Sequence, residues 1–171
     1  MHEIFVLKST DIIQIGIDTI LLESTSLRQL SNKLDFTFVK VVDTILKSKG
    51  RVVVTGIGKS AIVGQKMVAT FNSTGTPSLF MHAADAIHGD LGMMQKEDVV
   101  ICISKSGNSP EIKALAPLIL KGGNDLIGMV GNLSSYLATK SDFVLDTTVE
   151  QEACPNDLAP TTSTTAQMAM G

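Results

Sequence analysis

Five short runs of apolar residues recur through the chain, and they restrict its fold more than any other feature. They occupy residues 51–55, 78–81, 98–104, 125–130 and 142–146. Each run has the length of a strand, and segments of helical character separate most of them. Because the runs are apolar throughout rather than alternating, they favour strands covered on both faces. We therefore expect an α/β fold, a three-layer αβα sandwich around a five-stranded parallel sheet.

The first fifty residues have a different pattern, with apolar side chains at helical spacing. Residues 11–32 repeat Ile and Leu at this spacing, and Ser9 or Thr10 could cap the start. Residues 35–49 repeat the same period and precede Gly50, a residue type that commonly ends helices. Two amino-terminal helices are predicted, and their broad apolar stripes are suited to contact between subunits.

The length of 171 residues favours a single domain, with residues 1–50 as a helical lead-in and residues 51–171 as the core. A net charge of −3 argues against nucleic-acid binding, which needs a basic face. No apolar run is long enough to span a membrane, and residues 1–9 lack the pattern of a secretory signal. Cys102 stands in an apolar run, which predicts a buried free thiol in a reducing compartment. We expect a cytoplasmic protein.

The stretch TGIGKSA, residues 55–61, has the composition of a phosphate-binding turn. A P-loop would need a glycine at position 53, where Val53 stands inside the strand. Gly56, Gly58 and Ala61 satisfy the spacing of a dinucleotide fingerprint, but the acidic residue expected at the end of the second strand is missing. Nucleotide binding stays open as an alternative, as does a turn that merely joins a strand to a helix.

A second turn, from Ser104 to Ser109, follows the third apolar run and has three serines around Gly107. Pro110 comes next, and proline is favoured in the first turn of a helix. Hydroxyls and free N–H groups at a helix N-terminus form an anion-binding site. Ligands of open parallel sheets bind outside the carboxyl ends of the strands, where both turns are expected. Together the turns predict a site for one small phosphorylated molecule.

Six motifs occur in a fixed order along the chain: Gly56-Ile57-Gly58-Lys59-Ser60, Ser73-Thr74-Gly75-Thr76-Pro77, His88-Gly89-Asp90-Leu91-Gly92-Met93, Ser104-x-Ser106-Gly107, Glu152-Ala153-Cys154-Pro155 and Leu158-Ala159-Pro160-Thr161. As a set they resemble the sugar isomerase (SIS) domain of the arabinose-5-phosphate isomerases. The resemblance covers nearly all of residues 50–171. The serine-rich loop alone is typical of any sugar-phosphate-binding SIS domain, whereas the motifs of His88 and Glu152 indicate the narrower family.

The resemblance implies a flavodoxin-like sheet and the interconversion of D-ribulose 5-phosphate and D-arabinose 5-phosphate, which supplies 3-deoxy-D-manno-octulosonate (Kdo) for lipopolysaccharide or capsule. A proton moves between C1 and C2 through an enediol, so no cofactor is expected. The site needs a phosphate anchor, a base, and a cation or donor for the oxyanion. No functional metal is expected, because the spacing of His82 and His88 is not diagnostic. A small phosphorylated sugar is the implied ligand, and a homotetramer with sites near subunit interfaces is the implied assembly.

Carried over to this chain, the phosphate ligands are expected among Ser60, Ser104, Ser106, Ser109, Gly58, Gly107 and Asn108. Lys59 resembles the catalytic lysine of the family. A cation at a helix N-terminus opposes the helix dipole, so its presence there suggests a nearby anion. The alternative for Lys59 is a solvated lysine at the start of a helix.

Three residues are candidates for proton transfer. Glu152 is the preferred base, with an exposed acidic run shared with Glu150 as the alternative. Glu111 resembles an active-site glutamate, although with Asn108 as N-cap it also fits a capping box. His88 is the third candidate, and the alternative for it is a histidine with a purely structural role. The sequence leaves the choice among the three open.

Two departures from the family concern the end of the chain. The family has a further histidine in a tail after the last helix, and this sequence stops at Gly171, so we expect the natural chain to continue. Many members also carry two regulatory CBS domains, which are not present in these 171 residues, as in single-domain members. Two other functions stay open: a non-catalytic SIS domain that senses a sugar phosphate, and an isomerase of another ketose phosphate.

Overall fold

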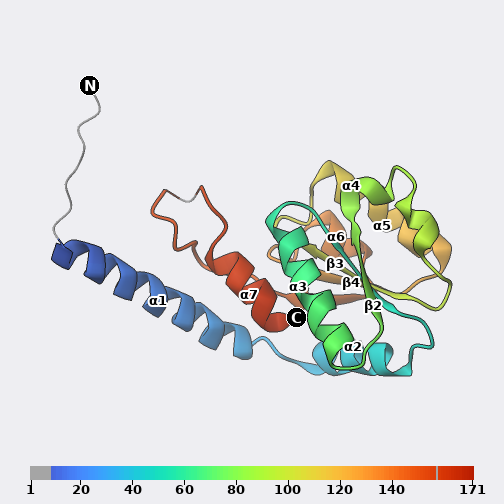
Figure 1. The fold of residues 1–171 in the computed structure, drawn as a ribbon, viewed down its shortest axis with the longest axis horizontal. Helices are drawn as coiled ribbons and strands as arrows, with labels where there is room; N and C mark the ends of the chain where they lie inside the picture. The colour runs from blue at the N-terminus through green and yellow to red at the C-terminus, as the bar shows by residue number, and fades with distance from the viewer. Residues whose placement is uncertain (1–8, 157) are drawn as a thin grey trace.

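The computed structural model describes residues 9–156 and 158–171 (Figure 1). Residues 1–8, where no secretory signal is predicted, lie outside this part of the chain. The predicted sheet is confirmed, with strands β1 (Val52–Gly56), β2 (Ser78–His82), β3 (Val99–Ser104), β4 (Leu126–Val130) and β5 (Phe143–Asp146). All neighbouring strands are parallel, in the order β2-β1-β3-β4-β5. The direction of winding reverses between β1 and β3, and ligands of such sheets bind at this point.

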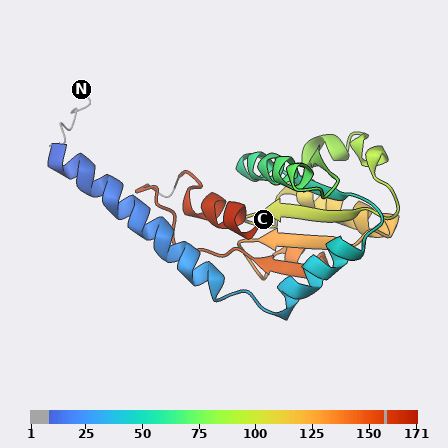
Figure 2. The ribbon, with the colours of Figure 1, turned by 60° about the horizontal axis from the view of Figure 1, so that its bottom comes forward.

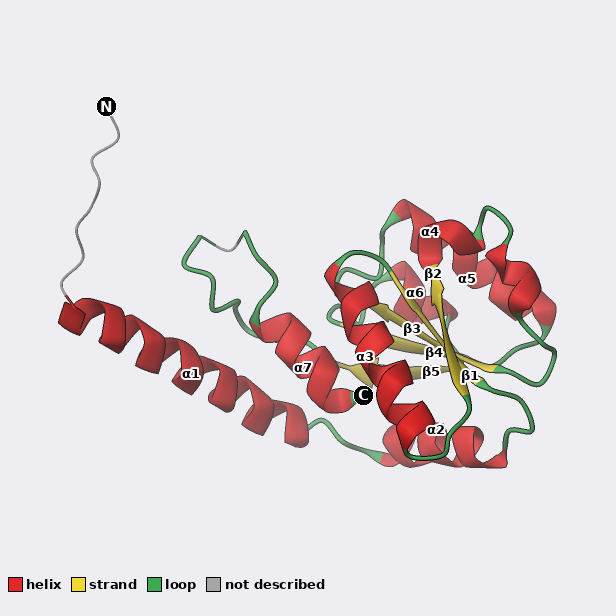
Figure 3. Ribbon diagram, viewed as in Figure 1, coloured by secondary structure: helices red, strands yellow, loops and turns green. Residues whose placement is uncertain are grey.

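Helices cover both faces of the sheet (Figure 3). One core involves α2 (Phe36–Lys47), α3 (Lys59–Ser73) and α7 (Thr162–Met170), and the opposite core involves α4 (Ala83–Ala86), α5 (Pro110–Gly122) and α6 (Tyr136–Lys140). A short 3₁₀ helix, η1 (Asp90–Met93), follows α4. Successive residues of β1 enter opposite cores, because side chains alternate along a strand. Burial on both faces explains why the central strands are apolar throughout.

The first helix, α1 (Ser9–Ser31), packs against α7 and extends away from the sheet (Figures 1 and 2). Only Ser26 and Leu30 are buried on it. Large apolar side chains such as Ile13 and Ile20 are 64% and 69% exposed. The predicted apolar stripe of α1 therefore lies largely in solvent in the single chain.

Details of the predicted elements also differ at their ends. The second helix ends at Lys47, with Ser48 rather than Gly50 after it, because Ser48 has an extended backbone with ψ of 139°. Its N–H still bonds to the carbonyls of Thr44 and Ile45. The last helix runs nine residues from Thr162 to Met170. Cys102 is a buried free thiol, as predicted, and burial raises its pKa to about 12. Among the described residues, no helix combines the length and apolarity needed to cross a bilayer.

Candidate active site

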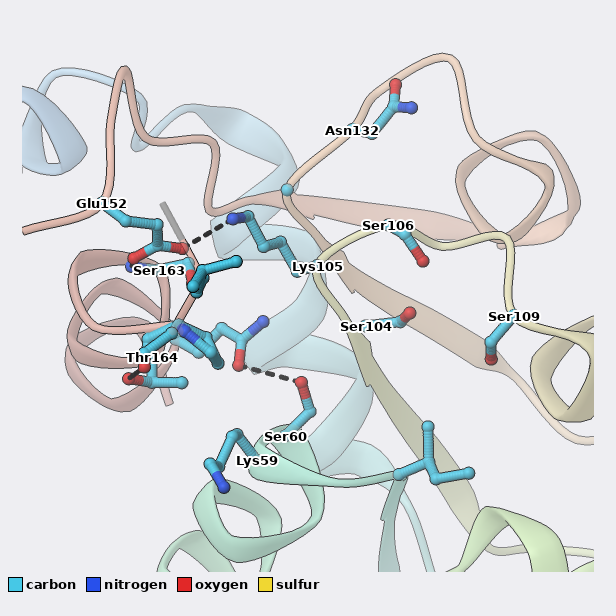
Figure 4. Close-up of a pocket in the computed structure, with 16 residues that line it drawn as sticks. Lys59, Ser60, Ser104, Lys105, Ser106, Ser109, Asn132, Glu152, Ser163 and Thr164 are labelled. Carbon is cyan, nitrogen blue, oxygen red and sulfur yellow. Dashed lines mark hydrogen bonds and ion pairs between the residues drawn. The ribbon is translucent and has the colours of Figure 1, made fainter. Parts of the chain in front are cut away.

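A cavity of about 500 Å³ opens at the carboxyl ends of β1 and β3 (Figure 4). Its wall comes from the β1–α3 turn with the start of α3, the β3–α5 loop, the β4–α6 loop, the segment between β5 and α7, and α7 itself. The four predicted serines all line it: Ser60, Ser104, Ser106 and Ser109. Lys59 and Glu152 line it as well. The structure therefore brings together six of the sequence-predicted residues from three separate segments.

The β1–α3 turn places Ser60 in the first turn of α3. Gly58 is the N-cap residue and has φ of +60°, a conformation that favours glycine. The hydroxyl of Ser60 donates to Oε1 of Gln167 on α7, at 3.1 Å. Lys59 is exposed, and its ammonium group points away from the serines (Figure 4). This turn thus supplies one oriented hydroxyl and one solvated cation.

The β3–α5 loop, residues 104–109, folds around Gly107, which has φ of +62°. The Gly107 N–H donates to the hydroxyl of Ser104 at 3.0 Å. The loop is also held from the β4–α6 side, because Gly131 N–H donates to the Lys105 carbonyl and Leu137 N–H donates to the Gly107 carbonyl. A Cβ at position 107 would lie 2.6 Å from the Cβ of Ser135. The loop therefore approaches α6 so closely that only glycine fits there.

Asn108 braces this loop instead of lining the cavity. Its Oδ1 accepts from the Tyr136 N–H at 3.0 Å, and its Nδ2 donates to the Ser106 carbonyl at 3.1 Å. The N-cap of α5 is Ser109, which places Glu111 at the second helical position. The capping box between Asn108 and Glu111 is therefore wrong, because the carboxamide of Asn108 serves the N-terminus of α6.

Glu152 is a buried carboxylate surrounded by donors, not part of an exposed acidic run. Its Oε1 accepts from Lys105 Nζ at 2.6 Å. Its Oε2 accepts from the Thr161 N–H at 2.7 Å, from the Thr161 hydroxyl at 3.1 Å and from the Ser163 N–H at 3.1 Å. Burial alone would raise its pKa, but donation from Lys105, Ser163 and Thr161 outweighs this and lowers the pKa to about 2. Glu150 is exposed and accepts from Gln29 of α1.

The remaining candidates lie outside the wall of this cavity. Glu111 is partly buried on α5, and His88 is exposed between α4 and η1. His82 ends β2, and its Nδ1 lies 3.8 Å from Oδ2 of Asp85. Within residues 9–156 and 158–171, no three His, Cys, Asp or Glu side chains gather as metal ligands would.

Sequence reasoning missed five polar residues of the cavity wall: Lys105, Asn132, Ser163, Thr164 and Gln167. Gln167 is 1% exposed on α7 and orients Ser60, and Lys105 binds Glu152 from within the serine-rich loop. Lys105 lies between the predicted phosphate ligands Ser104 and Ser106 in the sequence, so its position could have indicated that it belongs to the site. Nothing local to Gln167 indicates that α7 packs beside the β1–α3 turn.

Comparison with known proteins places this geometry in a family. Residues 45–171 match the SIS domain family. The chain is 48% identical over 164 residues to arabinose 5-phosphate isomerase KdsD of Pseudomonas aeruginosa, covering 96% of this chain and 50% of the relative. It is 48% identical over 150 residues to arabinose 5-phosphate isomerase KpsF of Escherichia coli, covering 87% and 46%. The chain thus spans about half the length of these curated relatives.

Solved structures agree in fold. A protein of Escherichia coli CFT073 solved in complex with arabinose 5-phosphate has a TM-score of 0.90 and 38% identity, over 95% of this chain and 86% of that one. A Listeria monocytogenes protein described as a sugar-phosphate isomerase has a TM-score of 0.92 and 33% identity, over 96% and 86%. By its sequence, its sheet order and the serine-lined cavity at the strand ends, this chain belongs to the SIS domain family.

Proposed function

We propose that this chain forms the catalytic domain of an aldose–ketose isomerase that interconverts D-ribulose 5-phosphate and D-arabinose 5-phosphate. The observation that carries the proposal is one cavity lined by serines of two helix-opening turns together with two lysines, Lys59 and Lys105, and the carboxylate of Glu152. A volume of about 500 Å³ is in the range of small-molecule sites. The names of the KdsD and KpsF relatives, and the solved complex with arabinose 5-phosphate, support this substrate over other phosphorylated sugars.

The phosphate group is assigned to the serines. Ser60 lies at the start of α3, and Ser104, Ser106 and Ser109 precede α5. Helix N-termini attract anions, because their free N–H groups and the helix dipole present positive potential. The turn glycines Gly58 and Gly107 shape the two turns, and Asn108 holds the second one in place.

The isomerisation itself needs charge at the sugar carbons. Removal of a proton from C1 of the ketose gives an enediolate with its charge on O2. A proton then moves from O1 to O2, and return of a proton at C2 gives the aldose. Lys59 is assigned to stabilise the oxyanion, and Glu152 to transfer the proton, because both line the cavity. With a pKa of about 2 the Glu152 carboxylate is ionised at neutral pH, and the hydrogen bonds that lower this pKa also make it a weaker base. Glu111 and His88 lie outside this wall in the single chain, so their part in proton transfer stays a prediction.

A homotetramer is the assembly we propose. Its support is the apolar surface of the first two helices, where Ile13, Ile20 and Phe36 are 64%, 69% and 84% exposed. Apolar surface of this kind commonly marks a subunit contact. Light scattering of the purified chain tests it, and a monomer at micromolar concentration would contradict it. We place the activity in the cytoplasm, in the supply of Kdo for lipopolysaccharide or capsule.

The deciding experiment follows ribulose 5-phosphate by NMR in D₂O. We expect arabinose 5-phosphate to form with deuterium at C2, because an enediol exchanges its proton with solvent. Tight binding of the sugar without turnover would instead support a non-catalytic sensor. Turnover only of a hexulose 6-phosphate would support the isomerase of another ketose phosphate. Lys66→Ala, an exposed lysine elsewhere on α3, serves as a matched control for variants of Lys59.

A further inference from the structure

An ion pair joins the serine-rich loop to the buried carboxylate of the cavity. Nζ of Lys105 lies 2.6 Å from Oε1 of Glu152 (Figure 4). The Glu152 side chain is 2% exposed, whereas that of Lys105 is 50% exposed. Lys105 is therefore the donor that closes the solvent side of an otherwise buried carboxylate.

Both ends of Lys105 are held. Its backbone carbonyl accepts from the Gly131 N–H, and its neighbours Ser104 and Ser106 line the cavity. The carboxylate is also held on its other oxygen, because Oε2 accepts from Thr161 and Ser163 at the start of α7. Within the described residues, Lys105 is the one hydrogen-bond donor to Oε1 of Glu152.

The charge of Lys105 is directed at the carboxylate and not at the serines. Its ammonium group pairs with Glu152 at 2.6 Å, so much of its charge is balanced before any phosphate binds. Within residues 9–156 and 158–171, the other charged side chains near Glu152 are accounted for: Lys59 lines the same cavity and Glu150 bonds to Gln29 of α1. Asp146 at the end of β5 pairs with Lys33. The helix α7 has no charged side chain.

We propose that Lys105 is a positioning residue, which orients the Glu152 carboxylate toward the sugar and couples it to the loop that binds the phosphate. The catalytic consequence rests on the proposed isomerase function, whereas the effect on the carboxylate does not. Lys105 lies between Ser104 and Ser106, which line the cavity. Its bond to Oε1 therefore holds the carboxylate at a set position relative to a phosphate group bound by these serines.

The test compares Lys105→Met and Lys105→Arg with the unaltered chain. Methionine keeps the length of the side chain without its charge, and arginine keeps the charge. Lys113→Met, an exposed lysine on α5, is the matched control. A ¹³C NMR titration of the Glu152 carboxyl, assigned with Glu152→Gln, measures the carboxylate directly. Loss of a neighbouring opposite charge is expected to raise its pKa by about one to three units in Lys105→Met.

The kinetic part uses ribulose 5-phosphate across a pH range. Lys105→Met is expected to lower kcat about tenfold or more, because a misplaced reacting group is costly. Its KM should change less than about threefold, since Lys105 does not hold the phosphate. The acid limb of the plot of kcat against pH should move to higher pH in Lys105→Met. Lys105→Arg should restore both kcat and the position of this limb. Lys113→Met should match the unaltered chain throughout.

The outcomes separate the two proposals. In one outcome the carboxyl titration shifts in Lys105→Met, but neither the unaltered chain nor any variant turns over the sugar. The role of Lys105 toward Glu152 then stands and the isomerase function fails. If the unaltered chain is active but the titration and the acid limb do not move, the positioning role is overturned. A rise in the KM of Lys105→Met with an unchanged pH profile would indicate that Lys105 is a phosphate ligand. This result would also overturn the positioning role.

Discussion

The hydroxyl of Ser60 on α3 donates to the side-chain carbonyl of Gln167 on α7, at 3.1 Å. The two residues are 107 positions apart, and Gln167 is 1% exposed. A serine assigned to the phosphate is thus oriented by the last helix of the domain. The last helix is therefore part of the site and not only a cover for the sheet.

Replacing Gln167 with leucine should weaken substrate binding. A neutral hydrogen bond contributes about 0.5–1.5 kcal/mol, so KM for ribulose 5-phosphate is expected to rise about two- to tenfold while kcat changes less. Steady-state kinetics measure both values. Met168→Ala, at a 40% exposed position of the same helix, is the control. An unchanged KM in Gln167→Leu would mean that Ser60 keeps its orientation without α7.

Ser106→Ala should raise KM about tenfold or more, because hydrogen bonds to charged groups contribute about 1.5–3 kcal/mol. Ser106 lines the cavity, whereas the exposed Ser134 of the adjoining β4–α6 loop does not. Ser134→Ala is therefore the matched control in the same kinetic assay. A loss of kcat at constant KM would remove Ser106 from the phosphate site.

Lys59→Ala should lower kcat by about 10²-fold or more, the scale of a lost oxyanion or acid–base interaction. Turnover of ribulose 5-phosphate measures the effect, with Lys66→Ala on the exposed face of α3 as the control. The fold should be unaffected, since Lys59 is exposed at the start of its helix. A variant with near-normal kcat would show that another group stabilises the enediolate.

Gly107→Ala should damage both the loop and its contact with α6. The backbone has φ of +62°, and the new Cβ would lie 2.6 Å from the Cβ of Ser135. Strain of this kind costs about 1–3 kcal/mol, which urea unfolding would detect. Because Ser135 caps α6, we also expect a raised KM from the displaced serine-rich loop. Gly75→Ala is the comparison, with φ of +95° and open space around the Cβ. If the two changes lowered the free energy of unfolding equally, the positive φ alone would explain the loss of stability, and the contact with Ser135 would contribute nothing.

The low pKa of Glu152 predicts a pH-dependent part of the stability. Its pKa is about 2 in the folded chain against an ordinary value of 4.5, so the unfolded chain binds more protons between these values. The stabilisation is complete above about pH 4.5 and is lost as the pH falls toward 2. The free energy of unfolding should therefore fall more steeply over this window in the unaltered chain than in Glu152→Gln. Parallel curves for the two proteins would contradict the prediction.

Most of the sheet and the four serines of the cavity could be predicted because their signals are local. A buried strand needs apolar residues on both faces, so the runs around Val53 and Ile101 show in the sequence itself. Turns that follow strands in a parallel sheet meet at one edge, so Ser60 and Ser106 could be placed together.

Asn108 shows where local reasoning ends. Its residue type and position suited it to the phosphate site, yet it does not line the cavity. The spacing of Asn108 and Glu111 fits a capping box, but the carboxamide bonds to Tyr136 on another helix, 28 positions away. A competing partner from elsewhere in the chain leaves no trace in a local pattern.

The order of apolar runs and glycine turns determined, without further information, the kind of fold and the edge of the sheet that carries the serines. Only the tertiary structure decided that α7 supplies Gln167 to Ser60 and that Lys105 binds Glu152. The physical reason is that apolar periodicity and turn propensity act over a few residues. Polar side chains separated by 47 or 107 positions are brought into contact by the packing of whole helices on the sheet.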